Sequence, residues 1–182
     1  MNRQSPRPEA PIRVVVPPAK VSEILAGIDL STHCGRRDRA MILMSDSGVR
    51  QVPALGMRVE DLITRMGKFW LRLPCKKALM QDDYAEMECN RSLAEAMKAY
   101  IDCAGLLSDP TGPMFRAINP QTDEITSGPI SMREVQTMIR YRAREAGIDA
   151  EIDWRSIRMS RFSAHQMLYY GEHHRVRERK AK

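Results

Sequence analysis

Apolar residues recur at helical spacing in several separate stretches of the chain. Residues 20–28 place their apolar side chains on one helical face, and residues 29–35 interrupt that pattern. A second apolar run follows a basic cluster and is broken by the Ser-Asp-Ser-Gly stretch at 45–48, after which the apolar pattern resumes. The sequence therefore predicts short amphipathic helices on either side of a glycine turn that carries Arg50.

Two stretches further along alternate between apolar and polar positions, as strands do. They are residues 68–73 and 84–89, and Pro74 turns the chain after the first of them. They predict an antiparallel hairpin with an irregular connection. Residues 110–128 contain several proline and glycine turns and predict a loop region.

Two longer helices are predicted in the second half of the chain. Residues 92–104 carry an apolar stripe that ends at Gly105. Ser131 and Glu134 form the sequence pattern of a capping box, which opens a helix that runs to Ala146. Residues 152–170 predict one further helix or two short ones.

These elements define an α+β fold class, mostly helical, with one small antiparallel β-sheet. Residues 1–19 are rich in proline and charge and are predicted to form an extended arm or linker. Residues 20–171 are predicted to form one domain, which agrees with a length of 182 residues and an apolar fraction of 43%. Residues 172–182 have nothing to bury and are predicted to be a basic tail.

Positive charge is concentrated toward the C-terminus. The net charge is +6, and from residue 133 onward twelve Lys and Arg residues stand against seven Asp and Glu residues. A basic half favours an anionic partner, most simply nucleic acid. A membrane surface is the weaker alternative, because the basic segments lack a bulky apolar face.

The sequence gives no indication of a membrane segment, a metal or a cofactor. No apolar run approaches the roughly 18 residues of a membrane span, and the first residues lack the apolar core of a secretory signal. The four cysteines are scattered without CxxC spacing, which is typical of reduced, packed thiols. We therefore expect a cytoplasmic protein.

Arg50 is the first candidate for binding an anion. A guanidinium holds an oxyanion through two parallel N–H groups, and a turn beside a glycine can present it in a concave surface. The alternative is that Arg50 is an ordinary solvated loop residue. Its spacing alone leaves both interpretations open.

Residues 35–62 resemble the first arginine box of the tyrosine recombinases, the phage-integrase and Xer-type family. The matching segments are RDRA at 37–40, GVR at 48–50 and LGMRVEDL at 55–62. Pro53 stands where the family has glutamate or aspartate. Family-like segments follow in the family's order, GPMF at 112–115 and the helical stretch at 130–150. The resemblance implies a recombinase catalytic-domain fold.

The resemblance also implies a site that grips phosphate. Arg50 would be its first arginine, and Lys76 or Lys77 would be the lysine that the family carries on a hairpin. The second arginine would be Arg158, in a degraded box where Arg155 replaces the family's histidine.

A second register of that degraded box remains open. In it Ser156 takes the place of the histidine and Met159 the place of the arginine. That register would leave the site without a second guanidinium.

The residues needed for strand cleavage are not expected here. The family's nucleophilic tyrosine would lie roughly 32 residues beyond Arg158, which is past Lys182. Tyr169 and Tyr170 come earlier and are interpreted as packing or surface aromatics. We therefore predict no catalytic residue and expect that the chain is not an enzyme.

The leading hypothesis is a catalytically inactive protein of recombinase fold that binds double-stranded DNA. It would regulate transcription or recombination by occupying sites, and a mobile element would encode it. Its expected contacts in the second half of the chain are basic residues of the last helices: Arg140, Arg142, Arg144, Arg155, Arg158 and Arg161.

Three alternatives remain open. An active recombinase would borrow its tyrosine from a partner or use Tyr169 or Tyr170. A protein–protein module would have lost DNA binding and would pair with a true recombinase or another regulator. A homodimer or a recombinase partner is also expected as a possible assembly of the DNA-binding form. The last alternative is a remnant without function.

Overall fold

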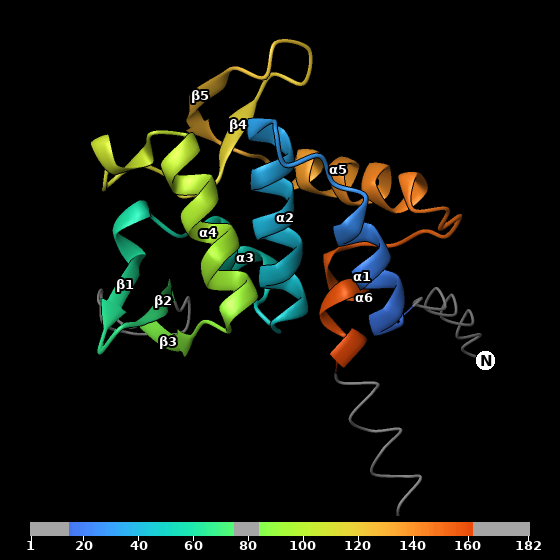
Figure 1. Ribbon diagram of the computed structural model, residues 1–182, viewed down its shortest axis with the longest axis horizontal. Coiled ribbons are helices and arrows are strands. Elements are labelled where there is room, and N and C mark those ends of the chain that lie inside the picture. The colour runs from blue at the N-terminus through green and yellow to red at the C-terminus, as the bar shows by residue number, and fades with distance from the viewer. Residues whose placement is uncertain (1–14, 75–83, 162–182) are drawn as a thin grey trace, which may run out of the picture.

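The computed structural model describes residues 15–74 and 84–161 of the chain (Figure 1). Two short 3-10 helices, at 59–61 and 106–108, supplement the regular elements. The α-helices and β-strands are α1 (Pro18–Ala26), α2 (His33–Asp46), α3 (Gln51–Leu55), β1 (Leu62–Arg65), β2 (Lys68–Pro74), β3 (Tyr84–Glu88), α4 (Arg91–Cys103), β4 (Arg116–Ile118), β5 (Ile125–Pro129), α5 (Met132–Glu145) and α6 (Trp154–Arg158).

Helix α2 is the centre of the core. Figure 1 shows α4 on one side of it and α1 and α6 on the other. Its residues 40–46 are all buried, so the helix has no solvent-facing side over its second half. It begins seven residues before the predicted apolar run, because Thr32 caps its first turn by accepting a hydrogen bond from the Gly35 N–H at 2.9 Å.

The predicted helices at 20–28, 92–104 and 131–146 are confirmed as α1, α4 and α5, with small shifts at their ends. Helix α4 begins one residue early, because Asn90 rather than Ser92 caps it through the Leu93 N–H. In α5 the capping box forms as predicted: the Ser131 N–H donates to Glu134 Oε2 at 2.7 Å, and the Glu134 N–H donates to Ser131 Oγ.

The α+β class is confirmed, but the prediction of one sheet is wrong. The predicted hairpin exists as β2 and β3, and β1 joins it to form a sheet of order β1-β2-β3. Strands β4 and β5 form a second, two-stranded sheet within the predicted loop region. These strands have only three and five residues, and the proline and glycine turns around them hid their alternation.

The chain before α1 is already part of the core. Val16 is buried, and its N–H donates to the Ser156 carbonyl of α6 at 3.3 Å. The predicted arm therefore contributes its last residues to the fold, and residues 1–14 lie outside the described part. So do Lys76, Lys77, Tyr169, Tyr170 and the predicted basic tail.

Within residues 15–74 and 84–161, no helix combines the length and the apolar character that a bilayer crossing requires. The same residues contain no group of three or more His, Cys, Asp or Glu side chains that could hold a metal ion.

A buried carboxylate joins α2 to α5. Asp38 accepts hydrogen bonds from Arg37 at 3.1 and 2.8 Å and from Arg142 at 3.0 and 2.9 Å, so two guanidinium groups share one carboxylate. Burial by itself lowers the pKa of Arg142, but the Asp38 charge and the bonds to Glu145 raise it, and the net shift is upward.

Two arginines therefore have a structural role. Arg37, which belongs to the basic cluster Arg36, Arg37 and Arg39 that precedes the apolar run, is buried beside Asp38. The expectation that Arg142 belongs to a cationic surface is wrong, because its side chain is only 12% exposed and bonds to Asp38 and Glu145. Both guanidinium groups hold the fold together.

We predict that Asp38→Asn costs about 3–5 kcal/mol of unfolding free energy, because it leaves two guanidinium groups without their shared counter-charge. Urea denaturation followed by circular dichroism measures the loss. The matched control is Asp102→Asn, which removes the exposed ion pair with Lys98 at 2.7 Å and should cost less than about 1 kcal/mol. Equal losses for the two variants would contradict a central role for Asp38.

Candidate functional site: a cationic cluster where α3 meets α6

Trp154 ties the end of α2 to the start of α6. Its indole Nε1–H donates to the Val49 carbonyl at 2.8 Å, and its own carbonyl accepts from Ser45 Oγ at 2.7 Å. The tryptophan is only 3% exposed, so both bonds are shielded from water. They place the backbone just before Arg50 beside the backbone just before Arg155.

The glycine turn after α2 carries Arg50 at the surface, which fits both interpretations of this residue that the sequence left open. Gly48 has φ of +93°, a conformation that favours glycine, and it ends α2. Val49 is then buried, whereas Arg50 is exposed at the N-cap position of α3. The backbone on one side of Arg50 is thus anchored while its side chain faces solvent.

Helix α6 supplies the other two cations. Asp153 caps it by accepting a hydrogen bond from the Ser156 N–H at 2.7 Å, and Ile157 anchors it in the core. Arg155 and Arg158 are three residues apart and therefore share one face of the helix. Arg155 is exposed and Arg158 is half-buried.

The charges of the three arginines act on one another. Burial lowers the pKa of the Arg158 guanidinium, and the positive charges of Arg155 and then Arg50 lower it further. None of the three forms an ion pair with any residue that the structure describes. Cations that repel one another without a counter-ion create a site that an anion stabilises. We call Arg50, Arg155 and Arg158 the arginine cluster.

The other predicted arginines differ in their surroundings. Arg161 donates to Asp46 at 2.9 Å at the edge of the arginine cluster, and its side chain remains 58% exposed. On α5, Arg140 pairs with Glu151 at 2.8 Å, and Arg144 is exposed. Arg142 donates two hydrogen bonds to Asp38, so its guanidinium is not free at the surface.

The two registers of the degraded box have different consequences in the structure. Ser156, the histidine position of the second register, is buried, and its Oγ donates to Asp153 at 2.9 Å. Met159 would offer a thioether where the family has a guanidinium. Only the first register brings a cation, Arg158, within electrostatic reach of Arg50.

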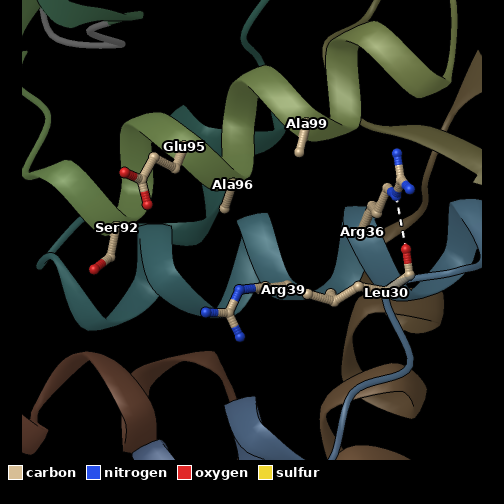
Figure 2. Close-up of a pocket in the computed structure, with 7 residues that line it drawn as sticks. All are labelled: Leu30, Arg36, Arg39, Ser92, Glu95, Ala96 and Ala99. Atoms are coloured by element: carbon tan, nitrogen blue, oxygen red, sulfur yellow. Dashed lines mark hydrogen bonds between the residues drawn. The ribbon is translucent and has the colours of Figure 1, made fainter.

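Two surface pockets lie elsewhere on the described part of the chain. One, of about 400 Å³, is lined by residues of α2 and α4; Figure 2 shows Ser92, Glu95, Ala96 and Ala99 on α4, and Arg36 on α2 with its Nε donating to the Leu30 carbonyl. The second, of about 890 Å³, lies over Asp38 and the β4–β5 turn. Neither of these two pockets is lined by a residue of the arginine cluster.

Trp154 is a site residue that sequence reasoning missed. In the sequence it is only the residue that precedes Arg155 in the degraded box. In the structure its bond to the Val49 carbonyl joins the two halves of the arginine cluster. A large aromatic residue beside the N-cap Asp153 was the available indication that the start of α6 is buried.

The comparisons with known proteins identify the fold. No family model and no curated protein matches the sequence. Among solved structures, the XerA recombinase matches with a TM-score of 0.64 and 14% identity, covering 86% of this chain and 51% of its own. The XerH site-specific recombinase bound to palindromic difH substrate, in a post-cleavage complex, matches with a TM-score of 0.63 and 15% identity. The match covers 82% of this chain and 41% of the XerH chain.

A pre-cleavage complex of XerH with difH substrate matches with a TM-score of 0.60 over 88% of this chain. The fold is therefore that of the tyrosine-recombinase catalytic domain, as the arginine-box resemblance implied. The chain spans about half, or less, of the length of these recombinases.

We predict that Trp154→Phe costs about 1–3 kcal/mol of unfolding free energy, because the buried Val49 carbonyl loses its donor and the smaller ring leaves part of the indole volume unfilled. Chemical denaturation measures the change. Trp70→Phe is the matched control, since Trp70 on β2 is only half-buried and has no described side-chain hydrogen bond. A Trp154 variant as stable as the control would show that the indole bond does not hold α6 in place.

Proposed function

We propose that this chain is a DNA-binding protein of recombinase fold whose arginine cluster binds the phosphate backbone of duplex DNA. The observation that supports this most directly is the grouping of Arg50, Arg155 and Arg158 without an acidic partner among the described residues. Phosphate contacts by arginine position a protein on DNA and supply most of its non-specific affinity. XerH, which shares the fold, was solved bound to its difH substrate.

The contact surface extends beyond the arginine cluster. Arg161 at its edge and Arg140 and Arg144 on α5 are exposed enough to reach further phosphates. Lys76 and Lys77 remain candidates from the sequence alone. Arg142 is left out, because releasing it would break its bonds to Asp38.

Binding without cleavage is the function we favour. Arg155 stands at the family's histidine position in the register that we adopt, and a guanidinium does not act as a general acid or base as an imidazole does. Pro53 offers no carboxylate where the family has one. The protein would act as a regulator of transcription or recombination that occupies DNA sites, encoded on a mobile element.

Removal of two cluster charges tests the DNA-binding surface. We predict that Arg50→Ala with Arg158→Ala weakens binding to random duplex DNA and reduces the slope of log K against log salt by about 1.8, since each phosphate contact contributes about 0.9. Fluorescence anisotropy over a salt series measures both quantities. The control is Arg91→Ala with Lys98→Ala on α4, which removes two charges from a helix that contributes no residue to the arginine cluster and should leave the slope unchanged.

An unchanged slope in the double variant would move the interface away from the arginine cluster. Absence of binding to any duplex at low salt would overturn the proposal and favour the protein–protein module.

The enzyme alternative has a separate test. A suicide substrate traps the phosphotyrosine adduct of an active recombinase, because the leaving strand diffuses away after cleavage. We predict that no covalent adduct forms on a denaturing gel when this chain binds such DNA. An adduct that disappears in a Tyr169→Phe and Tyr170→Phe variant would establish strand cleavage by this chain and contradict the inactive assignment.

A further inference from the structure

We infer that the arginine cluster prefers a terminal phosphate group, a phosphomonoester at a DNA end or nick, over the internal phosphodiesters of intact duplex. This inference rests on the proposed function, since it specifies which phosphate the same site binds best. It follows from the arrangement and number of the cations at the position where the related fold carries a histidine.

Arg158 lies within range of two other positive charges. Arg155 lies one helical turn before it on α6, and the Trp154 bond to the Val49 carbonyl holds the backbone next to Arg50 beside the start of α6. In the register of the degraded box that our proposal adopts, Arg155 stands in the place of the family's histidine and adds a third positive charge to Arg50 and Arg158. No described acid lies within ion-pair distance to reduce that charge.

The number of negative charges separates the two kinds of phosphate. An internal phosphodiester carries one negative charge and has two non-bridging oxygens. A terminal phosphomonoester carries about 1.5 to 2 negative charges at neutral pH and offers three acceptor oxygens. The additional charge and the third acceptor oxygen allow the terminal group to relieve more of the mutual repulsion of three neighbouring cations than a phosphodiester does.

The arginine cluster is also accessible to a strand end. Arg50 and Arg155 are exposed, and neither surface pocket encloses them. A phosphate at a nick is free of one sugar, so it can rotate toward the half-buried Arg158 more easily than a phosphate held on both sides by the continuous backbone.

The test compares duplexes of one sequence and length that differ at a single position. They are intact, nicked with a 5′-phosphate, nicked with a 5′-hydroxyl, and nicked with a 3′-phosphate. We expect at least one phosphorylated nick to bind roughly tenfold more tightly than the hydroxyl nick, as charge-assisted hydrogen bonds would give. The 5′- and 3′-phosphate arms show which end is recognised.

Variants connect the preference to Arg155. Arg155→Gln should make the binding affinities for phosphorylated and hydroxyl nicks about equal, whatever its effect on the affinity for intact duplex. The matched control is Arg91→Gln on α4, which also removes one positive charge and should leave the ratio of the two affinities unchanged. Circular dichroism checks that both variants fold, which the exposure of both side chains favours.

The outcomes separate this inference from the proposed function. Equal binding of the phosphorylated and hydroxyl nicks, with intact duplex still bound in a salt-dependent way, overturns the inference and leaves the proposed function standing. A preference that survives Arg155→Gln also overturns it. Failure to bind any duplex overturns both.

Discussion

The fold depends on how the polar side chains of the central helix α2 are satisfied. Most of α2 is buried, yet it carries Asp38, Ser45 and Asp46. A buried polar group without a partner costs free energy, so each of these side chains must find one. Asp38 bonds to its neighbour Arg37, and all three have a partner in the last described elements: Arg142, the Trp154 carbonyl and Arg161, which lie 104, 109 and 115 residues further along the chain.

That constraint determines where the positive charge collects. The bonds of Ser45 and Asp46 draw α6 against the end of α2, and the turn after α2 carries Arg50. Arg50 and Arg158 would repel each other in isolation, but the surrounding packing and hydrogen bonds hold them in place. The stability of the core thus offsets an unfavourable arrangement of charge at the surface, which an anion can relieve.

The local features of the sequence predicted the local features of the structure. The helices at α1, α4 and α5, the capping box of Ser131 and Glu134, and the β2–β3 hairpin were all readable from spacing. The arginine-box resemblance identified the recombinase fold and singled out Arg50 and Arg158, which the structure places near each other. These predictions depend on residues close together in the sequence or on an ordered series of motifs.

The long-range contacts were not predictable in this way. Arg142 and Arg140 look alike in the sequence, and only the position of Asp38 on a helix 104 residues away makes one of them structural. The hydrogen bond between Trp154 and the Val49 carbonyl could not be predicted either, because the two residues are far apart in the sequence. Strands β4 and β5 were missed because they are too short for alternation to stand out among turns.

The hydrogen bond from Val16 to the Ser156 carbonyl has a practical consequence. Ser156 lies between Arg155 and Arg158, so the chain enters the folded part beside the arginine cluster. A fluorophore attached at Val15, which is partly exposed, would report directly on whatever occupies that surface.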